Sequence, residues 1–173
     1  TRLPKWLIKE KEILAIWDDH DFGLNDGGRD YLYKEEAKKM FLNFWNVAEN
    51  DPRNYREGLY FKKVKNIDEA EVEIIALDTR YFRSKLNGQK NAYKPNQNPQ
   101  ATILGKEQWD WFQSSIDNST ANAIIVLSSI QVLATDHPYE KWANFPLERS
   151  KLIRILSEAA QYKTIIVVSG DRH

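Results

Sequence analysis

Short apolar runs alternate along this chain with segments in which apolar residues recur at helical spacing, and this alternation constrains the fold more than any other feature. The run Ala123–Ile130 is almost uninterrupted, which is typical of a strand buried on both faces of a sheet, and Thr164–Val168 is a further predicted buried strand. Residues 31–49 and Leu147–Ala160 instead repeat apolar side chains as amphipathic helices do. The alternation predicts an α/β fold.

The segments between these elements carry weaker signals. Leu59–Val64 and Val72–Leu77 are predicted strands, and the turn residues at 66–69 suit a hairpin between them. A short helix is expected after Gly105. Residues 84–101 form a long polar loop, which in a compact domain is usually functional or mobile.

Length and composition exclude several classes of protein. The 173 residues match about one domain, and no repeat or linker divides them, so we expect a single domain over residues 1–173. The 25 Lys and Arg balance 25 Asp and Glu, which gives no global attraction for nucleic acid or anionic membranes. Absence of cysteine excludes a disulfide framework, a zinc finger and a thiol nucleophile. No apolar run approaches the roughly 18 residues of a membrane-spanning helix.

The two ends of the sequence suggest a piece of a longer protein. The chain opens on Thr1 without an initiator Met or a visible signal peptide, and it stops abruptly at His173. We therefore expect further segments on both sides of it.

Polar side chains gather where three of the apolar runs end. Ligands of open α/β sheets collect just beyond the carboxyl ends of strands, so these positions are candidates for a shared site. All three histidines, His20, His137 and His173, lie at or shortly after such ends. The runs are Glu12–Trp17 before Asp18-Asp19-His20-Asp21, Ala123–Leu127 before Ser128-Ser129-Ile130-Gln131, and Ile165–Val168 before Ser169-Gly170-Asp171-Arg172-His173.

The cluster Asp18–Asp21 places three carboxylates around one imidazole. These carboxylates repel one another unless a cation neutralises them, which favours a metal site with His20 as a ligand or a general acid. A solvated turn or helix N-cap is the alternative, since Asp favours both. The glycine-rich loop that follows favours function, because it allows close backbone approach and adds the oxygen donors of Asn25 and Asp26.

Two further candidates are weaker on their own. Asp171 and His173, two residues apart after a strand, could share Zn, Fe or Mn through mixed oxygen and nitrogen ligands, or could be a polar strand end or the remnant of a tag. Arg80 could bind a phosphate through its planar fork, or could pair with Asp78 or Asp110.

The sequence lacks the patterns of several other enzyme classes. No Gly-x-Ser-x-Gly surrounds Ser128 or Ser129, which argues against a serine hydrolase. Walker A and Rossmann glycine patterns are also absent.

The motifs taken together resemble the PhoD-like alkaline phosphatases, a branch of the calcineurin-like metallophosphoesterases. They occur in the family's order over nearly the whole chain, and the spacing between the first and the last is right. The matching segments are Trp17–Gly28, Leu77–Arg83, Leu104–Trp109, Ser128–Leu133, Glu140–Arg149 and Ser169–His173.

This resemblance implies a fold and a reaction. The fold would be the calcineurin-like metallophosphatase αββα sandwich, with a metal centre at the strand ends that hydrolyses phosphate mono- or diesters. Calcium, iron, zinc and manganese are the candidate metals, and a small phosphate ester is the expected partner. Members are often exported, so a periplasmic, extracellular or envelope-associated location is favoured.

The resemblance also assigns roles to residues. Asp19 matches a metal-bridging position that is usually Asn in the wider superfamily, and Asp171 and His173 match the final metal-binding motif. His20 matches the imidazole that protonates the leaving oxygen, with the adjacent carboxylate of Asp21 as a second catalytic group. Substrate contacts are expected from Asn25, Arg80 and Gln131. Gln131 stands where the wider superfamily has a metal-binding His, so a weak metal ligand, or a group that only supports the ligands, is the alternative for it.

One departure limits the expected activity. The family's upstream metal ligands, including a Gly-Asp-x-x-Tyr motif, and its downstream segment are not in this sequence, so we expect an incomplete sandwich that is inactive as it stands. The competing hypothesis is a binding or structural module that kept the fold and lost the site. Intact Asp19, His20, Asp171 and His173 favour the enzyme.

Overall fold

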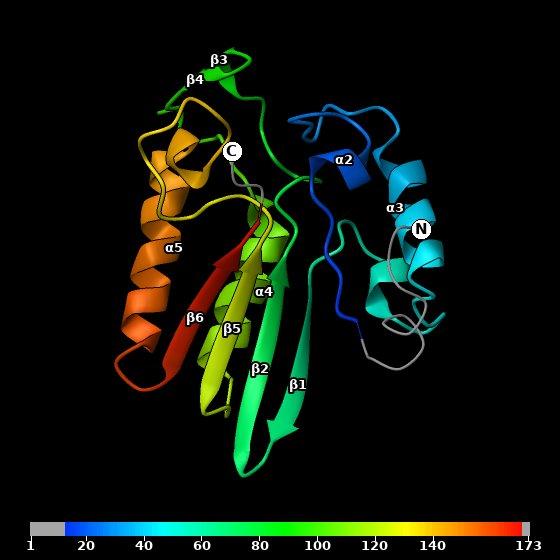
Figure 1. Cartoon of the computed structure of the whole chain (residues 1–173), viewed down its shortest axis with the longest axis vertical. Coiled ribbons are helices and arrows are strands. Elements are labelled where there is room, and N and C mark those ends of the chain that lie inside the picture. Colours follow the sequence, from blue (N-terminus) through cyan, green and yellow to red (C-terminus); the bar gives the residue numbers. More distant parts are fainter. Residues whose placement is uncertain (1–12, 171–173) are drawn as a thin grey trace.

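A four-stranded mixed sheet is the centre of the computed structural model, which describes residues 13–170 (Figure 1). The strand order is β1-β2-β5-β6, with β1 antiparallel to β2 and the other three strands parallel. The strands are β1 (Phe61–Ile67), β2 (Ala70–Leu77), β5 (Ala123–Ser128) and β6 (Thr164–Ser169). The mixed α/β fold predicted from the alternation is confirmed at this level.

The connections follow from the local sequence. β1 and β2 form the expected hairpin, with Asp68 at its turn in the left-handed region (φ 54°), which Asp tolerates better than most residues. Parallel strands need longer crossovers, and here these are α4 (Gly105–Asp117) and α5 (Pro146–Ala159). Both helices were predicted from their periodicity, and α5 begins with a proline, whose fixed φ suits the first turn.

The main core lies between the sheet and these two helices. The apolar face of α4, formed by Trp109, Phe112 and Ile116, is buried and packs against side chains of β2, β5 and α5. Every second residue of β5 points into this core. The principal members are Ile75, Leu77, Trp109, Phe112, Ile116, Ile124, Val126, Leu152 and Ile155.

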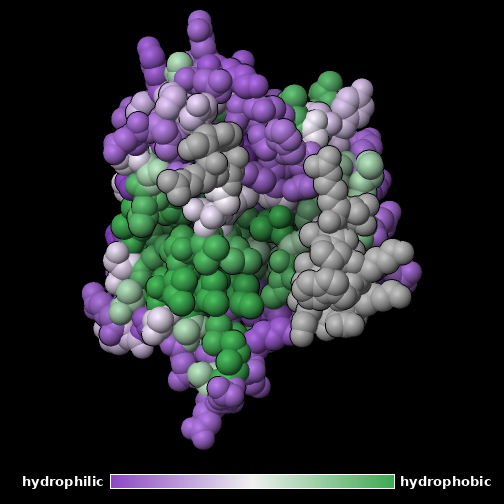
Figure 2. Space-filling view, in the orientation of Figure 1, coloured by the Kyte–Doolittle hydropathy of each residue, from purple (hydrophilic) through white to green (hydrophobic). Residues whose placement is uncertain are grey.

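The opposite face of the sheet is apolar and open among the described residues. Figure 2 shows a broad hydrophobic area over the strands on this side. Ile166 and Val168 of β6 are each nearly half exposed. The prediction that β6 is a buried strand is therefore wrong for the described part of the chain, because β6 is at the end of the strand order and carries helices on one face only.

A second apolar cluster joins the N-terminal segment to the sheet. Side chains of α2 (Asp19–Phe22) and α3 (Lys34–Phe44) contribute to this cluster, and the 3₁₀ turn η1 (Pro52–Asn54) contacts α3. The buried members of the cluster are Trp17, Phe22, Phe41, Leu42, Leu59 and Tyr81. The cluster places the acidic segment of α2 beside the carboxyl ends of the parallel strands (Figure 1).

Three sequence predictions need correction here. Residues 13–17 are not a strand, since no described strand pairs with them and Trp17 packs into the second cluster. The helix predicted over 31–49 ends at Phe44, because Asn46 turns into the left-handed region (φ 48°). The polar loop 84–101 contains a hairpin, β3 (Asn87–Gln89) and β4 (Ala92–Lys94).

Within residues 13–170, no helix is long and apolar enough to cross a membrane.

Candidate functional site

The cluster Asp18–Asp21 begins a single helical turn, α2. Asp18 is the N-cap residue, and its carbonyl accepts from the amide of Phe22 at 2.8 Å. Gly23 ends the turn with φ 107°, a left-handed conformation that glycine adopts without strain. Successive side chains on so short a turn point in different directions, so these acidic residues face different surroundings.

Asp19 points inward and His20 points outward. Asp19 is 8% exposed, and its Oδ2 accepts the amide hydrogen of Asp26 at 2.9 Å. The His20 side chain is 82% exposed, with Nε2 3.9 Å from Asp19 Oδ1. The carboxylate is thus fixed by the backbone, while the imidazole is accessible to a substrate.

Asp18 and Asp21 line a cavity of about 380 Å³ at the ends of β5 and β6. The lining also includes Ser128 at the end of β5 with Ser129 after it, and Ser169 at the end of β6 with Gly170 after it. This is the position where open α/β sheets bind ligands. The polar clusters that begin at Asp18 and at Ser128 therefore both lie beside Ser169 and Gly170, the described part of the third cluster.

Gln131 lies on an adjacent cavity of about 290 Å³ that also includes Ser169 and Gly170. Its Oε1 is 3.2 Å from Nε2 of His137. The structure therefore brings Gln131, Asp18 and Asp21 around the end of β6. The remaining predicted ligands, Asp171 and His173, follow Gly170 directly in the sequence but lie outside the described residues.

The side chain of Arg80 is buried and engaged internally. Its Nε donates to Asp18 Oδ1 at 2.6 Å, and Nη1 pairs with Glu140. Burial alone would lower the pKa of Arg80, but the charges of Glu140 and Asp18 outweigh it and raise the pKa. The ion-pair alternative for Arg80 is thus realised with Asp18 and Glu140, in place of Asp78 or Asp110, and its contact with substrate stays a prediction.

Arg83 shares Glu140 with Arg80. Its Nε lies 2.8 Å from Glu140 Oε1, and its Nη2 donates to the carbonyls of Gly27, at 2.7 Å, and Asp26. We call Asp18, Arg80, Arg83 and Glu140 the arginine–glutamate cluster. It ties the loop after α2 to the segment after β2 and to the segment before α5, and so it holds the backbone amide that fixes Asp19.

Asp78 is a second anchor that the sequence analysis missed. Its carboxylate accepts from Trp17 Nε1 at 2.8 Å, from the amide of Leu59 at 2.7 Å and from the amide of Arg80 at 2.9 Å. Such a buried acid after a strand looks from the sequence like a ligand candidate or an ion-pair partner. Its actual role is to join three segments that lie far apart in the chain.

Asn25 lies on the exposed part of the loop after α2. Its Nδ2 donates to Asp26 Oδ2 at 2.7 Å, and the hydroxyl of Tyr93 donates to the same oxygen at 2.7 Å. Burial, followed by the hydrogen bond to Asp26, raises the pKa of Tyr93, so the phenol stays protonated. The β3–β4 hairpin therefore supports this loop, and the substrate contact of Asn25 remains a prediction.

Metal ligation needs more donors than the described residues bring together. Among residues 13–170, no group of three or more His, Asp or Glu side chains is placed to hold a metal ion. Asp19 is directed to a backbone amide and Asp18 to Arg80. Any complete site must draw on Asp171, His173 or further residues outside this part of the chain.

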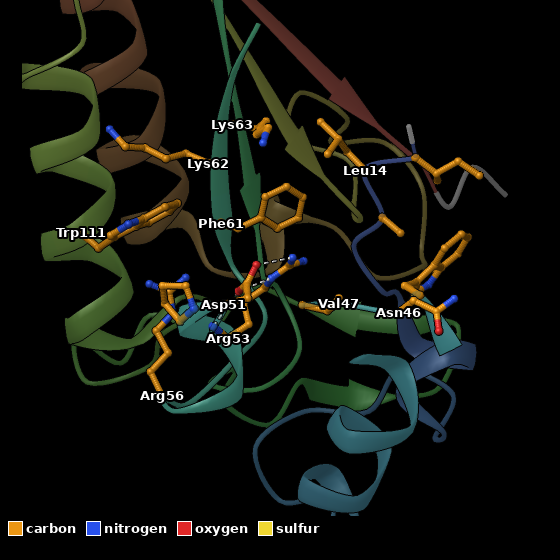
Figure 3. Close-up of a pocket in the computed structure, with 14 residues that line it drawn as sticks. Leu14, Asn46, Val47, Asp51, Arg53, Arg56, Phe61, Lys62, Lys63 and Trp111 are labelled. Atoms are coloured by element: carbon orange, nitrogen blue, oxygen red, sulfur yellow. Dashed lines mark hydrogen bonds and ion pairs between the residues drawn. The ribbon is translucent and has the colours of Figure 1, made fainter. Parts of the chain in front are cut away.

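A further cavity of about 360 Å³ lies beside β1 (Figure 3). Arg53 and Arg56 line it together with Lys62 and Lys63, and Arg53 pairs with Asp51 at 2.8 Å. Its lining includes none of the site residues predicted from the sequence. Cationic side chains of the described chain therefore gather at this cavity.

The chain resembles known phosphatases in sequence and in structure. Alkaline phosphatase D of Bacillus subtilis (strain 168) is 26% identical over 108 residues, which cover 56% of this chain and 18% of that protein. A solved structure described as "Structure of PhoD" superposes with a TM-score of 0.62 and 22% identity over 91% of this chain and 34% of that chain. The chain thus spans about a fifth of the curated relative and a third of the solved structure.

The similarity to the solved structure establishes the fold, and the assignment to a family is based on the sequence. The profile of the family described as PhoD-like phosphatase matches residues 8–173, which is nearly the whole length. The chain therefore belongs to the PhoD-like phosphatase family.

Proposed function

We propose that this chain forms part of the active site of an enzyme that hydrolyses phosphate mono- or diesters. The observation that carries the proposal is the cavity at the ends of β5 and β6, which Asp18 and Asp21 line together with Ser169 and Gly170. Membership of the PhoD-like phosphatase family supports the same reaction class. Family membership favours a phosphate ester as the substrate, and the carboxylates of the cavity need bound cations to admit its negative charge.

We propose that the reaction depends on metal ions held by Asp19, Asp171 and His173, together with residues outside the described part of the chain. Carboxylate and imidazole donors suit calcium, iron, zinc or manganese in different combinations. When bound, such ions polarise phosphoryl oxygens and lower the pKa of a water molecule. The amide of Asp26 orients the Asp19 carboxylate for this role.

His20 is proposed as the general acid. Its exposed ring can reach a leaving oxygen, and as the bond from phosphorus to that oxygen breaks, the imidazolium gives it a proton. The Asp19 carboxylate, 3.9 Å from Nε2, can orient the ring, and Asp21, on the wall of the strand-end cavity, is the second catalytic carboxylate.

The open face of the sheet supports the fuller fold. A metallophosphatase sandwich packs two sheets face to face, and the apolar side chains of β6 offer such a packing surface (Figure 2). We propose that a second sheet covers this face in the complete protein. An exported location remains a prediction from the resemblance.

Two variants of the protein that carries this chain test the proposed roles. His20→Ala should lower turnover of p-nitrophenyl phosphate or its bis-ester by about 10²–10⁴-fold and leave the metal content unchanged. Asp19→Ala should remove metal as well as activity. Equal metal loss in both variants would make His20 a ligand, and full activity in both would exclude this site.

A further inference from the structure

A cavity of about 670 Å³ between α2 and α3 has His20 on its wall. Asp21 lines both this cavity and the one at the strand ends, so the two are neighbours. Most of the remaining lining is aromatic or aliphatic, and we call it the aromatic cavity. These side chains are Phe22, Tyr31, Tyr33, Ala37, Met40, Phe41, Phe44 and Trp45.

Helix α3 leaves several of its large apolar side chains exposed, although its amphipathic sequence predicts that they face the core. Phe41 is buried, but Met40 is 72% exposed and Phe44 is 52% exposed. Exposed large apolar side chains that gather in one place mark binding surfaces more often than scattered ones do. Here they gather beside the residue proposed to protonate the leaving oxygen.

The walls of the cavity are held by ring contacts. Phe22 and Tyr31 have their ring centroids 5.2 Å apart, and Phe44 and Trp45 have theirs 5.1 Å apart. Phe22 and Phe41 also contact the buried Trp17, which anchors this end of α2. The cavity is therefore a formed surface with the volume of a small-molecule site.

The charges on the lining select against a second anionic group. Among the described residues of the lining, Asp21 and Glu36 are the carboxylates and none is Lys or Arg. The arginines and lysines of the cavity beside β1 show the opposite arrangement. A substrate group that enters the aromatic cavity should therefore be apolar and without negative charge.

We propose that the aromatic cavity receives the leaving alcohol, and that the preferred substrates are phosphate esters of uncharged aromatic or bulky apolar alcohols. This rests on the proposed phosphoesterase function, with the phosphoryl group at the strand ends. Water forms the new bond to phosphorus, the bond to the leaving oxygen breaks, and the alcohol departs with the proton of His20. The proton that the water releases restores His20.

The test compares two esters in the protein that carries this chain. Phe44→Ala and Met40→Ala should each lower kcat/KM for 2-naphthyl phosphate by roughly tenfold, mainly through KM, because they remove apolar contacts with the leaving group. Their kcat/KM for glycerol 2-phosphate should change less than about twofold. Tyr162→Ala, which removes an exposed aromatic side chain outside the cavity, is the control and should affect neither ester.

Binding of the product alcohol separates this proposal from the proposed function. Titration calorimetry with 2-naphthol should show binding to the wild type and weaker binding to Phe44→Ala, even in a His20→Ala background without turnover. Equal loss on both esters, or naphthol binding that ignores Phe44 and Met40, would overturn the cavity proposal. Absence of turnover on every ester, with naphthol binding retained, would overturn the phosphoesterase assignment instead.

Discussion

At the scale of single residues, the arginine–glutamate cluster is the part of the site that rests most on tertiary structure. Arg80, Arg83 and Glu140 are each almost fully buried, and two guanidinium groups share one carboxylate. A buried charge is tolerated when it is paired, and removing its partner leaves it uncompensated. The positioning of Asp19 depends on this cluster through the carbonyls that Arg83 holds.

Glu140→Gln should therefore be strongly destabilising. Loss of the carboxylate leaves two buried guanidinium groups without their shared partner, which typically costs about 3–5 kcal/mol in the free energy of unfolding. Urea denaturation of the wild type and the variant measures this difference in the free energy of unfolding. Glu158→Gln is the matched control, because its exposed ion pair with Arg154 should contribute less than about 1 kcal/mol. Similar effects of the two changes would show that Glu140 does not stabilise the fold through charge.

Asp51 predicts an acid-dependent loss of stability. The side-chain hydrogen bonds from Arg53 hold the pKa of Asp51 below its ordinary value, although partial burial opposes this. A depressed pKa in the folded state stabilises the fold above the unfolded-state pKa, and this contribution is lost as the pH falls. Asp51→Asn should thus flatten the fall in the free energy of unfolding between about pH 5 and about pH 3. An unchanged pH profile would contradict the role given to this pair.

At the scale of elements, the sequence predicts best where the signal is local. Helices α4 and α5 and the β1–β2 hairpin follow from periodicity and turn residues within each segment. Residues 13–17 have a strand-like composition, but a strand also needs a partner, and none of the described strands supplies one. The short β3–β4 hairpin escaped prediction because its polar residues carry no alternation, and its position depends on contacts such as that of Tyr93 with Asp26.

The exposure of strand β6 leads us to expect that the 173-residue chain self-associates in solution. It lies at the edge of the described sheet, with half-exposed Ile166 and Val168 on the open face. Exposed edges and apolar faces of this kind favour self-association. Sedimentation velocity should show concentration-dependent association that Val168→Lys reduces and Tyr162→Lys does not. A monomer at all concentrations would show that the open face is not adhesive.

At the scale of the whole molecule, the sequence predicted which strand ends lie together better than which partners the residues there would have. Strand ends of a parallel sheet meet at one edge, so the approach of Gln131 to Gly170 follows from topology, whereas Asp21 follows no described strand and is placed there by the packing of α2 in the second apolar cluster. The partners of Arg80 could not be predicted, since Asp18 and Glu140 lie about sixty positions away on either side and only the folded chain brings them together. Folding likewise decides that α3 leaves Met40 and Phe44 exposed beside His20.

The incomplete donor set predicts that the 173-residue chain neither turns over phosphate esters nor binds metal tightly. Among residues 13–170, no three His, Asp or Glu side chains converge on a metal position. Titration of the chelator-treated chain with Zn²⁺, Mn²⁺ or Ca²⁺ should show no micromolar binding. Tight binding with metal-dependent turnover would mean that residues 171–173 complete a site without further segments.

The most direct measurement of the central claim is turnover of bis-p-nitrophenyl phosphate and p-nitrophenyl phosphate by the protein that carries this chain, before chelation, after chelation and after metal is restored. A phosphoesterase site that uses Asp19, Asp171 and His173 as metal ligands predicts activity that chelation abolishes and metal restores, with no recovery in Asp19→Ala. Turnover that survives chelation, or that returns fully in Asp19→Ala, would contradict it.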